Sequence, residues 1–211
     1  MMSWRNIAAS AAVIGLAMGG AISAMESSSE ASTGAAAATR VSHLDRITVK
    51  GTLRLLAKPR ISATASEIIN ANSGKCLEVY HSLKQNETKV DQYRCNGTKT
   101  QFWKFGLVGS FQGNPVYELI NANSGKCADV YRFGTSDGTQ VNQYTCQGTY
   151  NQYWIGVIAN GYYVYLNYNS RKVLEVYRSS KADYGKVDQW ADNGTLTQSW
   201  QTQTSSVAEG R

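Results

Sequence analysis

The chain has 211 residues, of which 42% are hydrophobic and 17% charged, and its formal net charge is +6. This length allows one or two domains. Residues 1–60 carry seven Lys/Arg and three Asp/Glu, whereas residues 61–211 carry fourteen and twelve, so most of the basic excess lies in the first part. The later part has no Lys/Arg cluster that could neutralise a run of phosphates, which argues against nucleic acid as a partner.

The first residues have the pattern of an export signal. Residues 1–5 are short and basic, residues 7–24 are apolar and rich in Ala and Gly, and the run ends in small residues. The alternative is a membrane anchor, but a stable span needs about 20 strongly apolar residues. The sequence therefore predicts a signal peptide over residues 1–24, a secreted, extracellular protein and no stable membrane span. It leaves the cleavage bond open.

The next segment carries no repeat pattern. Residues 25–40 are rich in Ser, Ala and Thr and have no apolar period, which is typical of a flexible linker. Residues 41–62 are basic with a few apolar side chains, and they could form a pro-segment, a lead-in strand or a disordered arm. We assign residues 25–62 to a linker or pro-segment and residues 205–211 to a flexible tail.

From residue 63 onward the chain repeats itself three times. The first copy contains INANSGKC at 69–76 and QFW at 101–103, and the second contains INANSGKC at 120–127 and QYW at 152–154. The third contains LNYNSRKV at 166–173 and QSW at 198–200. The copies are offset by 51 and then 46 residues, and each aligns from its Cys or Val position to its final Trp without a gap. One structural unit is therefore used three times over residues 63–204.

The cysteines follow the repeats. The first two copies each hold two cysteines nineteen positions apart, and the third copy has Val173 and Asp192 at those positions. Because both members are lost together in an exported chain, we expect a disulfide within each copy, with free buried thiols as the alternative. Each bond would close a loop of about twenty residues, worth roughly 3 kcal/mol. The predicted pairs are Cys76–Cys95 and Cys127–Cys146.

The segments between turn signals look like short strands. Residues 76–80 and 90–95 alternate with period two and are rich in Val and Tyr, and Asn-Ser-Gly and Asn-Gly-Thr clusters separate them. No sustained helical period follows residue 63. We expect an all-β domain of about twelve short strands, in which three copies close a barrel around one pseudo-threefold axis.

At these residues the chain resembles the ricin B-chain lectin domain, a family that includes carbohydrate-binding modules of family 13. The resemblance covers roughly residues 63–204 and depends on three Gln-x-Trp motifs together with the Ser-Gly-Lys-Cys segment and the second cysteine. It implies a β-trefoil with pseudo-threefold symmetry. It also implies binding of a carbohydrate, of galactose or xylan type, at up to three shallow sites.

A shallow sugar site needs an aromatic platform for the C–H face and an acid or amide that can bond two hydroxyls. Strand alternation places such residues on one face of each copy. The candidate carbohydrate-binding residues are Glu78, Asp91 and Tyr93 in copy one; Asp129, Asn142, Tyr144, Asn151 and Gln152 in copy two; and Glu175, Asp188 and Trp190 in copy three.

The three candidate sites are unequal. Copy two matches the family pattern, with Asp129, Asn142 and Asn151. Copies one and three carry Glu for that Asp, Asp for the first Asn and Thr for the second. Two carboxylates that converge without a cation repel each other, which raises the question of a bound ion or a lost site, so copies one and three are expected to be altered in specificity or silent. We expect copy two to be the working site. The three Trp residues of the motifs are expected in the core, and their Gln residues are expected to brace the chain or the acid.

Binding without catalysis is the predicted function. Only His43 and His81 are present, neither recurs, and no spacing supports a metal cluster or a nucleophilic set, so no catalytic residue, metal or cofactor is predicted. The alternative is a β-trefoil that binds proteins, for example a protease inhibitor, and does not bind sugar. The sequence leaves open the sugar, the number of active sites and the oligomeric state.

Overall fold

The structure, a computed structural model, describes residue 44 and residues 51–204. The predicted signal peptide (1–24), the tail (205–211) and most of the predicted linker (25–43 and 45–50) lie outside the described residues.

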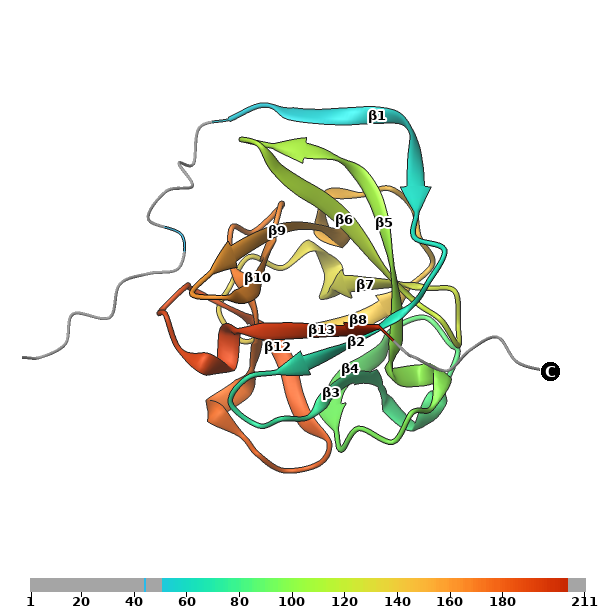
Figure 1. Cartoon of the computed structure of the whole chain (residues 1–211), viewed down its shortest axis with the longest axis vertical. Helices are drawn as coiled ribbons and strands as arrows, with labels where there is room; N and C mark the ends of the chain where they lie inside the picture. Colours follow the sequence, from blue (N-terminus) through green and yellow to red (C-terminus); the bar gives the residue numbers. More distant parts are fainter. Residues whose placement is uncertain (1–43, 45–50, 205–211) are drawn as a thin grey trace, which may run out of the picture. The chain divides into compact units, whose positions relative to one another are not determined.

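Six strands close a barrel by antiparallel pairing. The ring runs β2–β5–β6–β9–β10–β13 and returns to β2, so every one of these strands has two neighbours (Figure 1). Closure of this kind leaves none of the six as a free edge. The barrel strands are β2 (Ser66–Asn70), β5 (Phe102–Phe111), β6 (Asn114–Asn121), β9 (Tyr153–Ala159), β10 (Tyr162–Asn167) and β13 (Trp200–Thr204).

Three hairpins complete the three repeats. Their second strands pair with one another, β4 with β8, β8 with β12 and β12 with β4, which makes a triangle around the pseudo-threefold axis. The predicted β-trefoil of twelve strands is confirmed, with a further strand before it. The hairpin strands are β3 (Cys76–Val79) and β4 (Thr88–Tyr93), β7 (Cys127–Val130) and β8 (Thr139–Tyr144), and β11 (Val173–Val176) and β12 (Gly185–Trp190).

Short 3-10 turns recur at two places in each repeat. One turn follows the first hairpin strand, and the other contains the Gln of each Gln-x-Trp motif. The first set is η1 (Tyr80–Ser82), η3 (Tyr131–Phe133) and η5 (Tyr177–Ser179), and the second is η2 (Lys99–Gln101), η4 (Tyr150–Gln152) and η6 (Leu196–Gln198).

The three tryptophans of the motifs form the centre of the core, as predicted. Trp103, Trp154 and Trp200 are each fully buried. Each indole N–H donates to a backbone carbonyl of its own repeat, at 2.9 to 3.1 Å. The indole thus contributes apolar area without leaving its polar atom unpaired.

One side chain joins all three repeats on the axis. The Nε2 atom of Gln140 donates to the carbonyl oxygens of Val90, Val141 and Val187, at 3.0, 2.8 and 2.8 Å. These three valines occupy equivalent positions in the three copies. The equivalent positions of Gln140 itself hold Lys89 and Lys186, so this amide breaks the symmetry.

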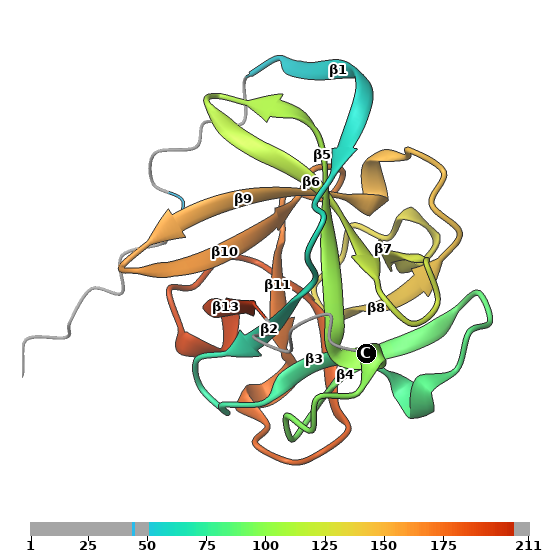
Figure 2. The same cartoon turned by 45° about the vertical axis from the view of Figure 1, so that its right-hand side comes forward.

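A thirteenth strand precedes the trefoil. Strand β1 (Leu53–Ile61) pairs antiparallel with β5, so of the alternatives for residues 41–62 a lead-in strand is present over this part (Figure 2). A Cβ at Gly109 of β5 would collide with the Arg54 carbonyl oxygen, and glycine is therefore needed at this close approach. Within the described residues, no helix has the length and apolar character that a membrane crossing requires.

Candidate functional site

The second repeat holds a cavity of about 360 Å³ where its hairpin meets the turn of η4. Four of the five candidate residues of copy two line it, namely Asp129, Asn142, Tyr144 and Asn151. Asp129 and Asn142 are cross-strand partners on β7 and β8, and Tyr144 lies two residues further on the same face as Asn142. The strand alternation thus brings acid, amide and aromatic ring to one cup.

The carboxylate of Asp129 is held by two amides. Asn151 donates from Nδ2 to Asp129 Oδ2 at 2.8 Å, and Gln152 donates from Nε2 to the same oxygen at 3.0 Å. Because both bonds end on Oδ2, the Oδ1 atom keeps its capacity to accept a further hydrogen bond. Burial raises the pKa of Asp129 to about 6, although the bonds from Gln152 and Asn151 lower it.

Gln152 lies behind the acid and outside the lining of the cavity. It is fully buried, its Oε1 accepts from the backbone N–H of Gln147 at 2.8 Å, and its Nε2 also donates to the carbonyl of Thr145 at 3.0 Å. Gln101 and Gln198 make the same set of contacts in their own repeats. The Gln of each Gln-x-Trp motif therefore positions the acid of its own repeat. This is the bracing role that the sequence predicted for it.

An aromatic residue that the sequence did not point to, Phe133, widens the cup. Phe133 lines it with 52% of its area exposed, and Tyr131 lies beside it. Phe133 has φ of 56°, a left-handed conformation that is costly for this residue type. Its counterparts in the other repeats are Ser82 and Ser179, so a comparison of the three copies could have identified this exposed ring.

Copies one and three hold their acids differently. Glu78 accepts from Gln101 at 2.9 Å and Glu175 accepts from Gln198 at 2.6 Å. Thr100, at the place of Asn151, donates to the Val79 carbonyl at 2.8 Å and not to the acid. The glutamates of these two repeats thus have one amide partner where Asp129 has two.

Copies one and three each carry a second acid, Asp91 and Asp188, that lies below the surface. Asp91 and Asp188 have no exposed area, and none of their carboxylate oxygens has a hydrogen-bond partner among the described residues. Both carboxylates are covered in this structure, and their predicted contact with a ligand stays a prediction. The cross-strand partners are Glu78 for Asp91 and Glu175 for Asp188.

A lysine supplies the positive charge that two converging carboxylates need. Lys89 Nζ lies 3.6 Å from Asp91 Oδ2, and Lys186 Nζ lies 3.3 Å from Asp188 Oδ2. Even so, burial raises the pKa of Asp91 to about 7, and the charge of Glu78 acts in the same direction. Burial likewise raises the pKa of Asp188 to about 7.

The buried glutamine directly before each candidate aromatic residue (Tyr93, Tyr144 and Trp190) has a structural role that the sequence did not reveal. Gln143 accepts from Ser124 Oγ at 2.6 Å and donates to the carbonyls of Leu83 and Gln85, both at 2.9 Å. Its donor bonds thus hold a loop of the neighbouring repeat. Gln92 and Gln189 make the equivalent contacts.

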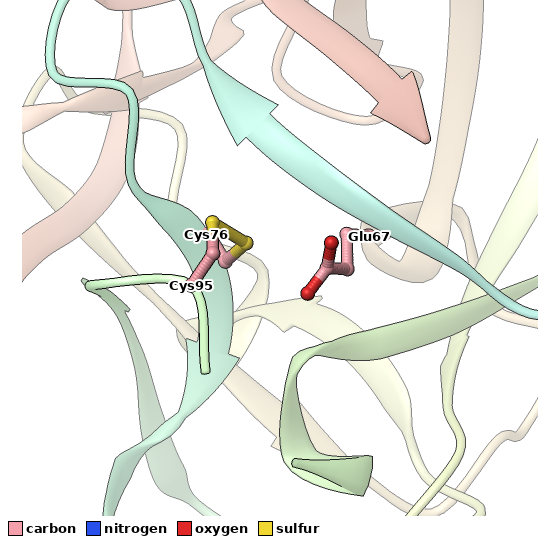
Figure 3. A group of neighbouring side chains, drawn as sticks. All are labelled: Glu67, Cys76 and Cys95. Carbon is pink, nitrogen blue, oxygen red and sulfur yellow. A yellow bond between two sulfur atoms is a disulfide. The ribbon is translucent and has the colours of Figure 1, made fainter. Parts of the chain in front are cut away.

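Both expected disulfides are present. Cys76–Cys95 and Cys127–Cys146 each have Cα atoms 5.1 Å apart. Glu67 lies beside the first bond, with its carboxylate directed toward the sulfur atoms (Figure 3). This grouping is not a metal centre, because a disulfide sulfur has no thiolate to offer a cation.

Comparison with known proteins agrees with this architecture. Residues 64–200 match the family described as the ricin-type beta-trefoil lectin domain. No curated protein sequence matches the chain significantly. Among solved structures, the designed threefold-symmetric protein ThreeFoil is 32% identical, with a TM-score of 0.61 over 66% of this chain and 97% of its own.

Two natural structures are also similar. An exo-beta-1,3-galactanase from Clostridium thermocellum is 32% identical, with a TM-score of 0.64, and the match covers 68% of this chain and 31% of that enzyme. The Rhizoctonia solani agglutinin shares the fold at 19% identity and a TM-score of 0.61, over 68% of this chain and 96% of its own. With three repeats, two intra-repeat disulfides and a family match over most of the described residues, the chain belongs to the ricin-type beta-trefoil lectin family.

Proposed function

We propose that this lectin-family protein binds a saccharide in the cup of its second repeat. One observation carries the proposal: Asp129, held by two amides, shares a cavity with the ring of Tyr144. The Asp129 Oδ1 and the Asn142 amide would bond neighbouring hydroxyls, and the Tyr144 ring would cover the C–H face of the sugar. Gln152 acts behind the acid and Asn151 beside it.

Galactose-type sugars are the preferred candidates, with xylan-type sugars next. The support is the 32% identity to a galactanase, which acts on a galactose polymer, although the match covers only 31% of that enzyme. A shallow cup with one principal stacking ring gives weak binding, with Kd in the millimolar to micromolar range, about −4 to −8 kcal/mol. Stronger binding would require several sites on one repeated polymer.

We also propose that the protein is exported and acts without catalysis. The two disulfides support an oxidising, extracellular setting. Mass spectrometry of the mature N-terminus would test the export signal and locate its cleavage bond. Glycosidases among the structural neighbours match this chain over about a third of their length, which suits an added binding module. A hydrolase screen on galactan and xylan should show no turnover.

The second candidate is a trefoil that binds proteins and not sugar. It is favoured by Asp91 and Asp188, since two of the three repeats keep this acid out of reach of a ligand. A glycan array separates the two candidates: the lectin proposal expects binding to galactose- or xylose-containing glycans, and the alternative expects none.

Calorimetric titration with galactose, xylose and cellobiose tests the site. Asp129→Ala and Tyr144→Ala should each abolish binding in the second repeat while circular dichroism shows an unchanged fold. Tyr150→Ala is the matched control, because Tyr150 is an aromatic residue with 52% of its area exposed that does not line the cavity. Binding by either cavity variant equal to that of the unaltered protein would overturn the assignment.

A further inference from the structure

Each candidate site receives one residue from the neighbouring repeat. Turns of the hairpins place Glu87, Gly138 and Tyr184 at equivalent positions, with φ of 63°, 78° and 61°. Their backbone N–H groups donate to the carbonyls of Gln143, Gln189 and Gln92, at 2.9, 2.8 and 2.8 Å. Those glutamines directly precede the aromatic residues Tyr144, Trp190 and Tyr93. Each turn residue is therefore anchored beside the candidate stacking ring of another repeat.

The turn position is held firmly. In each repeat the side-chain amide of the same glutamine donates to two further carbonyls of the incoming loop, as Gln92 does to Ser180 and Ala182 at 2.9 and 3.0 Å. A loop fixed by three hydrogen bonds presents its turn side chain in a constant direction. The chemistry of the side chain, and not the path of the loop, therefore distinguishes the three sites.

The three turn residues differ strongly in size. The Tyr184 ring lies 4.8 Å from the ring of Tyr93, 5.5 Å from Tyr80 and 5.3 Å from His81, measured between centroids. At these separations the rings are in contact, and no sugar ring fits between Tyr184 and Tyr93. In the third repeat, Gly138 places no side chain against the half-buried Trp190 ring, whereas a Cβ there would lie 3.6 Å from the ring, at ordinary contact distance.

The turn residue at the second site, Glu87, differs from the other two in its charge. Glu87 lines the cavity of the second repeat together with Asp129 and Tyr144, and its charge raises the pKa of Asp129. The Glu87 side chain is exposed. The second site thus remains open with an acidic wall.

We propose that the turn residue contributed by the neighbouring repeat decides which sites admit a saccharide. Tyr184 closes the first site, whereas Gly138 leaves the third site open, in addition to the second. The inference rests on the proposed function. It extends it from one working site to two and names Tyr184 and Gly138 as the residues that set access.

Nuclear magnetic resonance of the full mature protein, titrated with galactose, tests the proposal. The backbone amides of Tyr93 and Tyr144 and the indole N–H of Trp190 report the three sites separately. In the unaltered protein we expect saturable shifts at Tyr144 and Trp190 and none at Tyr93. Tyr184→Gly should produce a new saturable shift at Tyr93, because it uncovers the ring on a backbone that favours glycine.

Gly138→Tyr is the reciprocal variant. It should remove the Trp190 response and keep that of Tyr144, which serves as the internal control for folding. Glu87 and Tyr184 show that the backbone accepts a side chain with positive φ at this position. The inference is overturned if Tyr93 responds in the unaltered protein, or if Tyr184→Gly leaves Tyr93 silent while Tyr144 responds. Absence of any Tyr144 response would instead overturn the proposed galactose function, and the inference with it.

Discussion

Asn151 donates its side-chain amide to the Asp129 carboxylate at 2.8 Å, and the equivalent positions of the other two repeats hold threonine. The same amide also donates to the Val130 carbonyl at 3.1 Å, which is the bond that Thr100 reproduces in the first repeat. The threonine thus preserves the backbone contact and loses the contact to the acid. This difference is the clearest distinction between the second site and the others.

Asn151→Thr tests that distinction. The substitution removes one of the two bonds that favour the charged form of Asp129, so the pKa of Asp129 should rise above about 6. A hydrogen bond to a charged group contributes about 1.5–3 kcal/mol, so without it less of Asp129 is ionised at pH 6.5. Galactose affinity at that pH should therefore fall by about tenfold. Carboxyl carbon resonances measured against pH give the pKa, and titration gives the affinity. An unchanged pKa would contradict the role assigned to Asn151.

Sugar binding should depend on pH around the pKa of Asp129. If the carboxylate accepts ligand hydroxyls, affinity is full above about pH 7 and declines as pH falls through about 6. At pH 5 about one tenth of Asp129 is ionised, so Kd should be about tenfold weaker. Calorimetric titration from pH 5 to pH 8 measures this decline. Affinity that is flat over the range would show that the charged form of Asp129 is not required.

Asp91→Asn should stabilise the protein, and more so at higher pH. The folded state has the higher pKa, about 7 against an ordinary value of 3.8, so the folded state binds more protons between these values. The free energy of unfolding therefore falls as pH rises from about 4 to about 7. Above about pH 7 the cost of keeping the ionised Asp91 buried is constant. Removing the acid removes that cost.

The expected gain is about 1–3 kcal/mol at pH 8 and close to none at pH 4, measured by urea denaturation. The second repeat already holds an asparagine, Asn142, at this position. Asp188→Asn, in the third repeat, should behave in the same way, because its carboxyl is equally buried. Destabilisation of similar size at both pH values would show that Asp91 has partners that favour its charge.

Gln140→Ala should destabilise the domain at its axis. The amide of Gln140 bonds three converging carbonyls, and its removal leaves them without that donor in a partly buried place. A loss of about 1–3 kcal/mol in the free energy of unfolding is expected. Gln203→Ala is the matched control, because Gln203 is exposed on β13. If both substitutions changed stability equally, the axial contact would contribute nothing.

The repeats made the fold predictable. Three gapless alignments, each ending in Gln-x-Trp, are enough to predict the core tryptophans, about twelve trefoil strands and both disulfides. These features depend on contacts within a repeat, where sequence spacing and strand alternation determine which side chains meet. The acid, amide and tyrosine of the second cup followed for the same reason.

Contacts between repeats could not be predicted in this way. Spacing within one copy does not show that Glu87 lies in the second site or that Tyr184 covers the first. Strand alternation placed Asp91 on the site face correctly, but it could not show that the carboxylate is completely covered. Ser82 and Ser179 share the left-handed backbone of Phe133, so the only sequence signal of this exposed ring is that Phe133 stands where the other two copies have serine.

A crystal of the protein soaked in galactose tests the central claim most directly. We expect a sugar in the second repeat, with a hydroxyl within hydrogen-bond distance of Asp129 Oδ1 and the C–H face of the ring against Tyr144. An empty second cup at saturating galactose, or a sugar held elsewhere with both residues uninvolved, would contradict the claim.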